Sequence, residues 1–185
     1  MATFGRIDAE RIYLRPYQPG DFDAMMEYQG LPEVVRFIPW PVRDEVLVRE
    51  ALNKGIMQVS LDSEGDYLVL AIVQQSDDKV IGQVNAMYRS LENKSAEFGY
   101  AINPVYGGNG YVSEACEVLI SALFATGLFH RVFAKIDARN APSEGVLKRL
   151  NLRKEAHHIQ DDFFKGEWTD TIIYAVLKDE WLARI

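Results

Sequence analysis

The order of hydrophobic and polar residues predicts a sheet flanked by helices. Ile12 and Leu14 alternate with polar neighbours, as in a half-buried strand that stops at Pro16. Short, nearly continuous apolar runs bounded by turn residues predict further strands. The predicted strands cover residues 11–15, 67–73, 80–88, 96–102, 131–137, 153–161 and 168–177.

A helical period of apolar residues separates these strands. Val46, Leu47, Leu52 and Ile56 share one face of a predicted helix. The predicted helices cover residues 21–29, 44–57, 113–126 and 141–150, and residues 37–41 form an apolar, proline-rich loop. Because strands and helices alternate with no linker or repeat, we expect a mixed α/β (α+β) fold around one central sheet, with residues 1–185 in a single domain.

Composition narrows the class of protein. The 185 residues include 27 acidic and 20 basic side chains, and the net charge of −7 argues against a nucleic-acid partner. The single cysteine, Cys116, excludes an intrachain disulfide and a multi-cysteine metal site. No apolar run is long enough to span a membrane, and charges from Arg6 onward argue against a secretory signal. We therefore expect a cytoplasmic protein.

A glycine-rich loop, residues 107–111, joins a predicted strand to a predicted helix. Glycines let the backbone approach a ligand, and the free N–H groups at a helix start form an anion site. The loop lacks the Lys-Ser/Thr of a P-loop and the spacing of a dinucleotide site. A turn without a ligand is the alternative.

Further motifs surround this loop in a fixed order. They are a strand Glu10–Pro16, then Asp21 and Trp40, Glu97-Phe98-Gly99-Tyr100, Pro104, Gly108-Asn109-Gly110-Tyr111-Val112-Ser113-Glu114-Ala115, His130-Arg131-Val132, Asn140 with Ser143, and Gly166, Trp168, Asp170 and Tyr174. In this order and spacing the chain resembles the GNAT acyl-CoA N-acetyltransferase superfamily, and within it the RimJ/RimL ribosomal-protein branch. The resemblance covers residues 9–182.

The resemblance implies a GNAT-like fold, whose mostly antiparallel sheet is splayed between its fourth and fifth strands. It implies acetyl-CoA as co-substrate and no metal. The residues it assigns to CoA binding are Ile102, Gly108, Asn109, Gly110, Tyr111, Val112 and Asn140.

The resemblance and the chemistry together suggest two catalytic residues. Glu97 is the candidate general base for the amine, and the alternative is a strand glutamate that is solvated or paired with a basic residue. Ser143 is the candidate proton donor to the CoA sulfur. The alternative is that its hydroxyl, in the first turn of a helix, only satisfies backbone hydrogen-bonding groups. Trp40 and Trp168 are candidate walls of the amine site, although packing is the commoner role of such residues.

Some positions depart from the family pattern. Val105 stands where the superfamily often has Gln or Arg, and Gly107 stands where the branch often has Trp. Leu147 stands where many members have a tyrosine. Asn151 replaces a glycine after the late helix, where asparagine suits a left-handed cap. These departures leave open a non-catalytic acyl-CoA sensor.

The predicted function is direct acetyl transfer from acetyl-CoA to a primary amine, without a covalent enzyme intermediate. The branch favours the α-amine of a protein N-terminus, with ribosomal proteins first. A polyamine or aminoglycoside acetyltransferase is the alternative. The resemblance is compatible with a monomer or a homodimer.

Overall fold

The computed structural model describes residues 2–184, and within them eight strands form one sheet in the order β1-β2-β3-β4-β5-β6-β8-β7. The strands are β1 Ile7–Asp8, β2 Ile12–Arg15, β3 Tyr67–Gln74, β4 Val80–Ser90, β5 Ser95–Ile102, β6 Arg131–Asp137, β7 Arg153–Phe164 and β8 Glu167–Leu177. The helices are α1 Phe22–Gln29, α2 Pro32–Val35, α3 Glu45–Met57, α4 Tyr111–Ala125, α5 Ala141–Arg149 and α6 Lys178–Leu182. Short 3-10 turns cover Pro19–Asp21 and Pro104–Tyr106. None of the helices in this part of the chain is both long and apolar enough to cross a bilayer.

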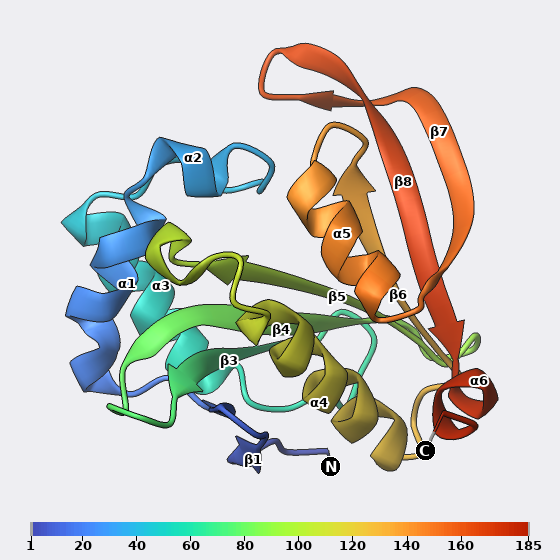
Figure 1. Cartoon of the computed structure of the whole chain (residues 1–185), viewed down its shortest axis with the longest axis horizontal. Helices are drawn as coiled ribbons and strands as arrows, with labels where there is room; N and C mark the ends of the chain where they lie inside the picture. Colours follow the sequence, from blue (N-terminus) through green and yellow to red (C-terminus); the bar gives the residue numbers. More distant parts are fainter. Residues whose placement is uncertain (1, 185) are drawn as a thin grey trace.

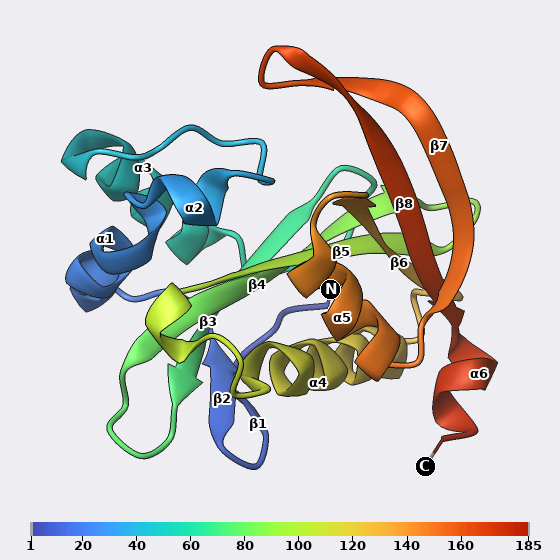
Figure 2. The ribbon, with the colours of Figure 1, turned by 45° about the horizontal axis from the view of Figure 1, so that its top comes forward.

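Two apolar cores lie on opposite faces of the sheet. Helices α1 and α3 cover one face, where Tyr28, Val48 and Leu52 pack against Val69 and Ala71 of β3. Helices α4 and α5 belong to the core on the other face, which also includes the C-terminal Trp181. Figures 1 and 2 show α1 and α3 on one side of β3, β4 and β5, and α4 on the other.

The sheet divides between β5 and β6, which are the fourth and fifth of the strands predicted from the sequence. The predicted splay is therefore confirmed. All other neighbouring strands are antiparallel, whereas β5 and β6 run parallel and pair only from Ser95 to Glu97. Beyond Glu97 the two strands diverge, and α5 lies beside the opening (Figure 1). The end of β5 therefore has one edge free of strand pairing, next to the first turns of α4 and α5.

The predicted elements are present, but the last hairpin is longer than the pattern indicates. Residues 162–164 continue β7 and Glu167 begins β8, because the connection is a two-residue turn. Lys165 and Gly166 both have positive φ, 50° and 92°, as such tight hairpins require. Asn151 also has a positive φ of 50°, so the predicted asparagine cap after α5 is confirmed.

Candidate active site

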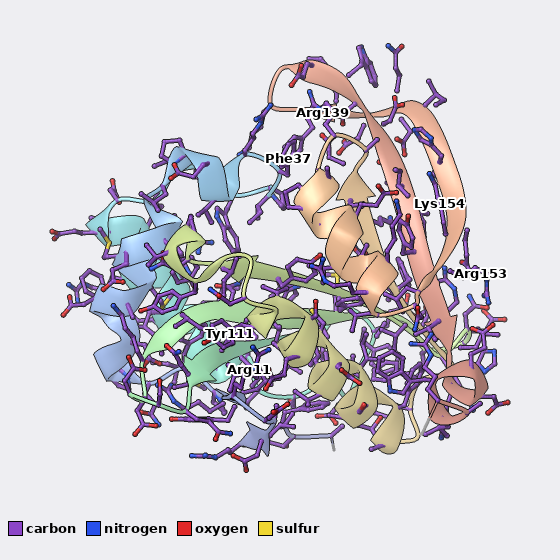
Figure 3. All side chains as sticks on the ribbon, viewed as in Figure 1. Arg11, Phe37, Tyr111, Arg139, Arg153 and Lys154 are labelled. Atoms are coloured by element: carbon purple, nitrogen blue, oxygen red, sulfur yellow. The ribbon has the colours of Figure 1, made fainter. Side chains whose placement is uncertain are left out.

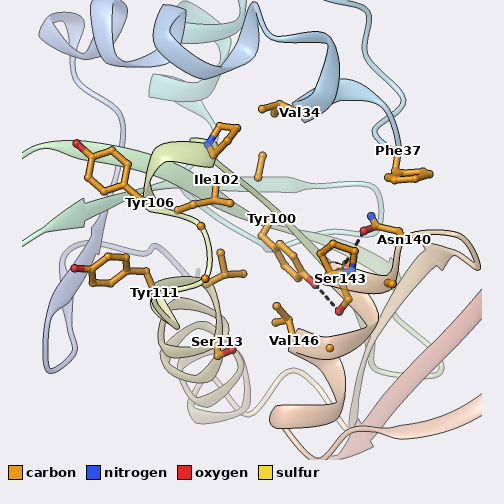
Figure 4. Close-up of a pocket in the computed structure, with 18 of the residues that line it drawn as sticks. Val34, Phe37, Tyr100, Ile102, Tyr106, Tyr111, Ser113, Asn140, Ser143 and Val146 are labelled. Carbon is orange, nitrogen blue, oxygen red and sulfur yellow. Dashed lines mark hydrogen bonds between the residues drawn. The ribbon is translucent and has the colours of Figure 1, made fainter.

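A cleft of about 630 Å³ lies where β5 and β6 separate, between the first turn of α4 and helix α5. We call it the α4–α5 cleft (Figure 4). Ile102 lines it from the end of β5, Gly108 and Gly110 from the glycine loop, and Ser143 and Val146 from α5. The cleft thus joins the free edge of β5 to two helix N-termini.

The glycine loop presents unpaired backbone donors to this cleft. Gly108 and Gly110 adopt left-handed φ values of 79° and 83°, and Gly110 is the residue before α4. Within the described chain, no acceptor pairs with the backbone N–H groups from Gly108 through Ser113. Because the positive end of the α4 dipole adds to these donors, the loop can hold a phosphate or pyrophosphate.

An ion-paired arginine supports the loop from the opposite side. Arg11 Nη1 donates to the carbonyl oxygen of Asn109 at 2.9 Å, and its Nη2 lies 2.9 Å from Oε2 of Glu114. The same guanidinium lies 5.0 Å from the ring centroid of Tyr111, and Figure 3 shows the two side chains next to each other. Glu114 also accepts the backbone N–H of Arg11 at 2.6 Å, so its carboxylate ties α4 to β2.

A pair of hydroxyl groups lines the cleft on the side of β5 and α5. Tyr100 of β5 and Ser143 of α5 share a hydrogen bond of 2.6 Å between their hydroxyl oxygens (Figure 4). Burial raises the pKa of Tyr100, so its hydroxyl stays protonated at neutral pH. Asn140 caps α5 by accepting the backbone N–H of Ser143 at 3.2 Å. The helix cap is therefore Asn140, and the alternative that the Ser143 hydroxyl only satisfies backbone is wrong.

A smaller cavity of about 280 Å³ adjoins the cleft, and we call it the Glu97 cavity. Glu97 and Gly99 of β5, Trp40, and Lys135 of β6 are among its lining residues. Residues common to the cleft and the cavity are Phe37, Ile38, Tyr100, Asn140 and Ser143. A group bound in the Glu97 cavity can therefore meet a group bound in the cleft next to the Tyr100–Ser143 pair.

The Glu97 carboxylate is held on one side only. Arg89 of β4 donates from Nε to Glu97 Oε2 at 2.7 Å, and its Nη2 lies 2.7 Å from the same oxygen. No residue in the described range 2–184 pairs with Oε1. The Glu97 side chain is 20% exposed. The pairing of Glu97 with a basic residue, which is the alternative to a catalytic role, is thus present. It leaves one carboxylate oxygen of Glu97 available to a ligand.

The loop between α2 and α3 forms the roof of this cavity. Lys165, at the tip of the β7–β8 hairpin, donates from Nζ to the carbonyl oxygens of Val35 at 2.6 Å and Trp40 at 3.2 Å. Arg139 lies 5.9 Å from the ring centroid of Phe37, and both are labelled in Figure 3. Two elements that follow β6 therefore fix the loop that carries Phe37 and Trp40.

Comparison with known proteins agrees with this architecture. Residues 11–153 match the model of the family described as "Acetyltransferase (GNAT) domain". The chain belongs to the GNAT acetyltransferase family. An uncharacterized N-acetyltransferase of Bacillus subtilis, YnaD, is 29% identical, over 95% of this chain and 98% of its own length.

Relatives with a named acceptor include ribosomal-protein acetyltransferases of the RimJ/RimL type. The [ribosomal protein uS5]-alanine N-acetyltransferase of Escherichia coli is 24% identical, over 95% of this chain and 92% of its own. The solved structure of RimL, a ribosomal L7/L12 alpha-N-protein acetyltransferase in complex with coenzyme A, superposes with a TM-score of 0.81 at 20% identity, covering 93% and 97% of the two chains. The chain is thus a RimJ/RimL-like acetyltransferase.

Most residues that the GNAT resemblance assigned to CoA do line the α4–α5 cleft. They are Ile102, Gly108, Gly110, Tyr111, Val112 and Asn140. Asn109 does not, because its side-chain amide donates back to the carbonyl oxygens of Tyr106 and Gly107 at 3.2 Å.

Of the two tryptophans predicted to wall the amine site, one lines the Glu97 cavity and the other does not. Trp40 lines the Glu97 cavity. Trp168 is 61% exposed on the β7–β8 hairpin, and its ring packs edge-on against Phe163 at 5.3 Å between centroids. A contact between Trp168 and the acceptor stays a prediction.

The departures from the GNAT pattern have simple structural outcomes. Val105 is 81% exposed, whereas Leu147 is fully buried in the core. Leu147 carries no hydroxyl, but the hydroxyl of Tyr100 reaches Ser143 from β5. The sequence pattern did not predict the positions of Tyr100 and Arg89 in the site, although Tyr100 lies within the Glu-x-Gly-Tyr motif.

Residues 2–184 contain no group of three or more histidine, cysteine, aspartate or glutamate side chains arranged to hold a metal ion. Cys116 is buried in α4, and burial raises the pKa of its thiol, so it stays protonated as a packing residue.

Proposed function

We propose that this acetyltransferase moves the acetyl group of acetyl-CoA directly to the α-amine of a protein N-terminus, with ribosomal proteins first among the acceptors. The α4–α5 cleft takes the CoA, and the Glu97 cavity takes the amine. The single observation that carries the proposal is the junction of the two spaces at Tyr100 and Ser143, which line both. Direct transfer requires such a meeting point.

In this proposal the glycine loop binds the pyrophosphate through backbone N–H groups from Gly108 through Val112. The Asn109 side chain is turned back onto the loop, so its contribution is limited to the backbone. The pantetheine arm follows the free edge of β5 near Ile102, and Asn140 orders the loop that leads into α5. Arg149, which lines the cleft from the end of α5, adds a positive charge for a phosphate.

The amine must lose its proton before it attacks the thioester carbonyl. Glu97 Oε1 is the acceptor we propose for that proton, directly or through one water, while Arg89 holds Oε2. Lys135 is exposed, lines the same cavity and, within the described chain, has no carboxylate partner, so its positive charge favours the neutral amine. An α-amine, with a pKa of about 7.7–8.0, already has a usable neutral fraction at pH 7.

Collapse of the tetrahedral intermediate breaks the C–S bond and leaves a thiolate. We assign its protonation to Ser143 Oγ, whose hydroxyl is already paired with Tyr100. An acceptor that enters as an ammonium loses two protons. The first passes to Glu97 before attack and then to solvent. The second, lost as the amide forms, replaces the proton that Ser143 gives to the sulfur, so the reaction is balanced.

The cavity lining and one of the relatives support this choice of acceptor. Arg89 and Lys135 face the amine site, and a polyamine with several ammonium groups meets like charge there. The Escherichia coli relative whose name specifies a ribosomal-protein alanine supports an N-terminal α-amine. The acceptor panel must nevertheless include small amines.

The test is an intact-mass screen with acetyl-CoA and equimolar acceptors: peptides with free N-termini, the same peptides with blocked N-termini, spermidine and an aminoglycoside. We expect one acetyl group on free-N-terminus peptides, stoichiometric with released thiol. Faster acetylation of spermidine or the aminoglycoside would overturn the α-amine assignment. CoA binding without thiol release for any amine would favour the sensor alternative.

A Ser143→Ala variant separates proton donation from packing. We expect kcat to fall about 10²-fold, with the acceptor KM nearly unchanged, because only leaving-group protonation is lost. Loss of one buried hydrogen bond should cost about 0.5–1.5 kcal/mol of stability, measured as a shift in Tm on the same preparation.

Tyr100→Phe is the matched variant, since it removes the partner hydroxyl and keeps the ring. We expect a smaller loss of kcat than in Ser143→Ala. A Ser143→Ala enzyme with a lowered Tm but wild-type kcat would show that the hydroxyl only stabilises the α5–β5 contact.

A further inference from the structure

Beside the Glu97 cavity lies a third space of about 650 Å³, which we call the Arg43 cavity. Trp40, Tyr67 and Met87 line both cavities, so the two adjoin. The far wall of the Arg43 cavity comes from Arg43 and from Lys54 of α3. No role in acetyl transfer requires this space.

Arg43 is a half-buried cation without a carboxylate partner among residues 2–184. Its Nη1 donates to Gln29 Oε1 at 2.5 Å, and its guanidinium lies 4.2 Å from the ring centroid of Trp40. Burial lowers the pKa of Arg43, and a guanidinium nevertheless keeps its charge. A partly desolvated charge with unused donors is stabilised when an anion binds.

A buried polar network fixes the position of Arg43. Gln29 Nε2 donates to Gln83 Oε1 at 3.1 Å and to the Tyr28 hydroxyl at 3.2 Å, which turns Gln29 Oε1 toward Arg43. Gln29 and Tyr28 are fully buried, and Gln83 is 4% exposed. The guanidinium is therefore preorganised, which lowers the entropy cost of binding an anion.

Two neutral donors beside Arg43 also lack acceptors within the described chain. The Trp40 indole N–H is buried without a hydrogen bond. The Tyr67 hydroxyl has no hydrogen-bond partner there either, and burial raises its pKa to about 12, so it remains a donor. A buried donor is normally paired, so the Trp40 indole is unsatisfied until a ligand accepts its hydrogen bond, and the Tyr67 hydroxyl offers a second donor beside it.

The charges that line the Arg43 cavity favour an anion. Arg43 and Lys54 are positive, and the one acid in the described lining is Asp66. Asp66 Oδ2 already accepts the backbone N–H groups of Asp62 and Ser63, both at 2.7 Å. This positive lining contrasts with the net charge of −7 for the whole chain.

Strand register gives the spacing between Tyr67, which lines the Arg43 cavity, and Glu97. Tyr67 pairs with Met87, and Met87 pairs with Glu97, so the three residues lie side by side on one face of the sheet. Adjacent strands are about 4.8 Å apart, which puts the backbones of Tyr67 and Glu97 about 10 Å apart. An extended peptide spans that distance in about three residues.

We infer that the Arg43 cavity binds an acidic side chain at the second or third residue of the acceptor peptide, through Arg43, Trp40 and Tyr67. This inference rests on the proposed function, because it assumes that the α-amine lies at Glu97. The carboxylate of a single α-amino acid is too close to its amine to reach Arg43.

The test compares pairs of C-terminally amidated peptides that differ only in Glu or Gln at position two or three. For the wild-type enzyme we expect kcat/KM at least tenfold higher for the Glu peptide at one of these positions. The dissociation constant of each peptide for the CoA-loaded protein, measured by calorimetry, should show the same preference. Alanine and alaninamide should not differ by this factor.

The variant Arg43→Gln should bring the Glu/Gln ratio close to one, and Arg43→Lys should retain part of it. Arg49→Gln is the matched control: it removes the same charge from an exposed residue of α3 whose guanidinium lies 4.4 Å from the Phe22 ring centroid. It should leave the ratio unchanged. Tm measurements establish that each variant is folded, and the wild-type comparison needs no variant at all.

The outcomes separate the two proposals. Equal acetylation of Glu and Gln peptides by the wild-type protein would overturn the carboxylate site and leave the proposed function standing. Preferential binding of Glu peptides that depends on Arg43, without acetylation of either peptide, would support the site and overturn the proposed function. An undiminished preference in folded Arg43→Gln would also overturn the inference.

Discussion

Replacing Glu97 with glutamine is expected to lower kcat by about 10²–10⁴-fold and to leave CoA affinity unchanged. Glutamine keeps the size of the side chain and can still contact Arg89, but it cannot take a proton. The Oε1 atom has no partner in the described chain and lines the cavity that we assign to the amine. Turnover with a peptide acceptor and calorimetry with CoA, both on the same preparation, measure the two quantities.

Glu92→Gln serves as the control for this variant, since Glu92 is exposed in the turn between β4 and β5 and the charge change is the same. We expect its kcat to equal that of the wild type. If Glu97→Gln also kept wild-type turnover from about pH 6 to about pH 9, then the base would be water or another group. Glu97 would then serve only to hold Arg89.

Replacing Gly110 with valine is expected to weaken CoA binding at least tenfold, equivalent to about 1.4 kcal/mol. The φ of Gly110 is 83°, a region that a β-branched residue rarely enters, and an added Cβ would lie 3.3 Å from Arg11 Nη2. The substitution therefore strains the loop and displaces the arginine that supports it. Calorimetric titration with CoA gives the affinity.

Gly127→Val is the matched control, because Gly127 also has a positive φ of 75° but follows the opposite end of α4. It should lower stability by a similar amount and leave CoA affinity unchanged. Unchanged CoA affinity in a folded Gly110→Val protein would mean that the glycine loop is only a turn.

The sequence predicted the sheet well because its central strands are buried on both faces. Strand β3 is almost entirely buried, so its apolar run is continuous, and most of β4 is buried as well. The short helices α2 and α6 were missed, since one turn of helix depends on tertiary contacts more than on local pattern. Most of β7 is exposed, which removes the alternation that marks a half-buried strand, and its length was underestimated.

The candidate site was predictable only where its residues are close in sequence. The glycine loop and the Asn140–Ser143 pair form local motifs at helix starts. The contact between Tyr100 and Ser143 joins residues 43 positions apart, and Arg43 meets Gln29 through a loop. Such contacts depend on strand register and on the splay between β5 and β6, which an apolar pattern does not specify.

The most direct measurement of the account is a crystal structure of the protein with CoA and an unreactive peptide whose α-amine is replaced by hydrogen. We expect the pyrophosphate on the backbone N–H groups of residues 108–112, and the CoA sulfur within about 3.5 Å of Ser143 Oγ. We also expect the peptide terminus in the Glu97 cavity, facing Glu97 Oε1. A CoA sulfur remote from Ser143, or a peptide bound outside the Glu97 cavity, would contradict direct transfer at this junction.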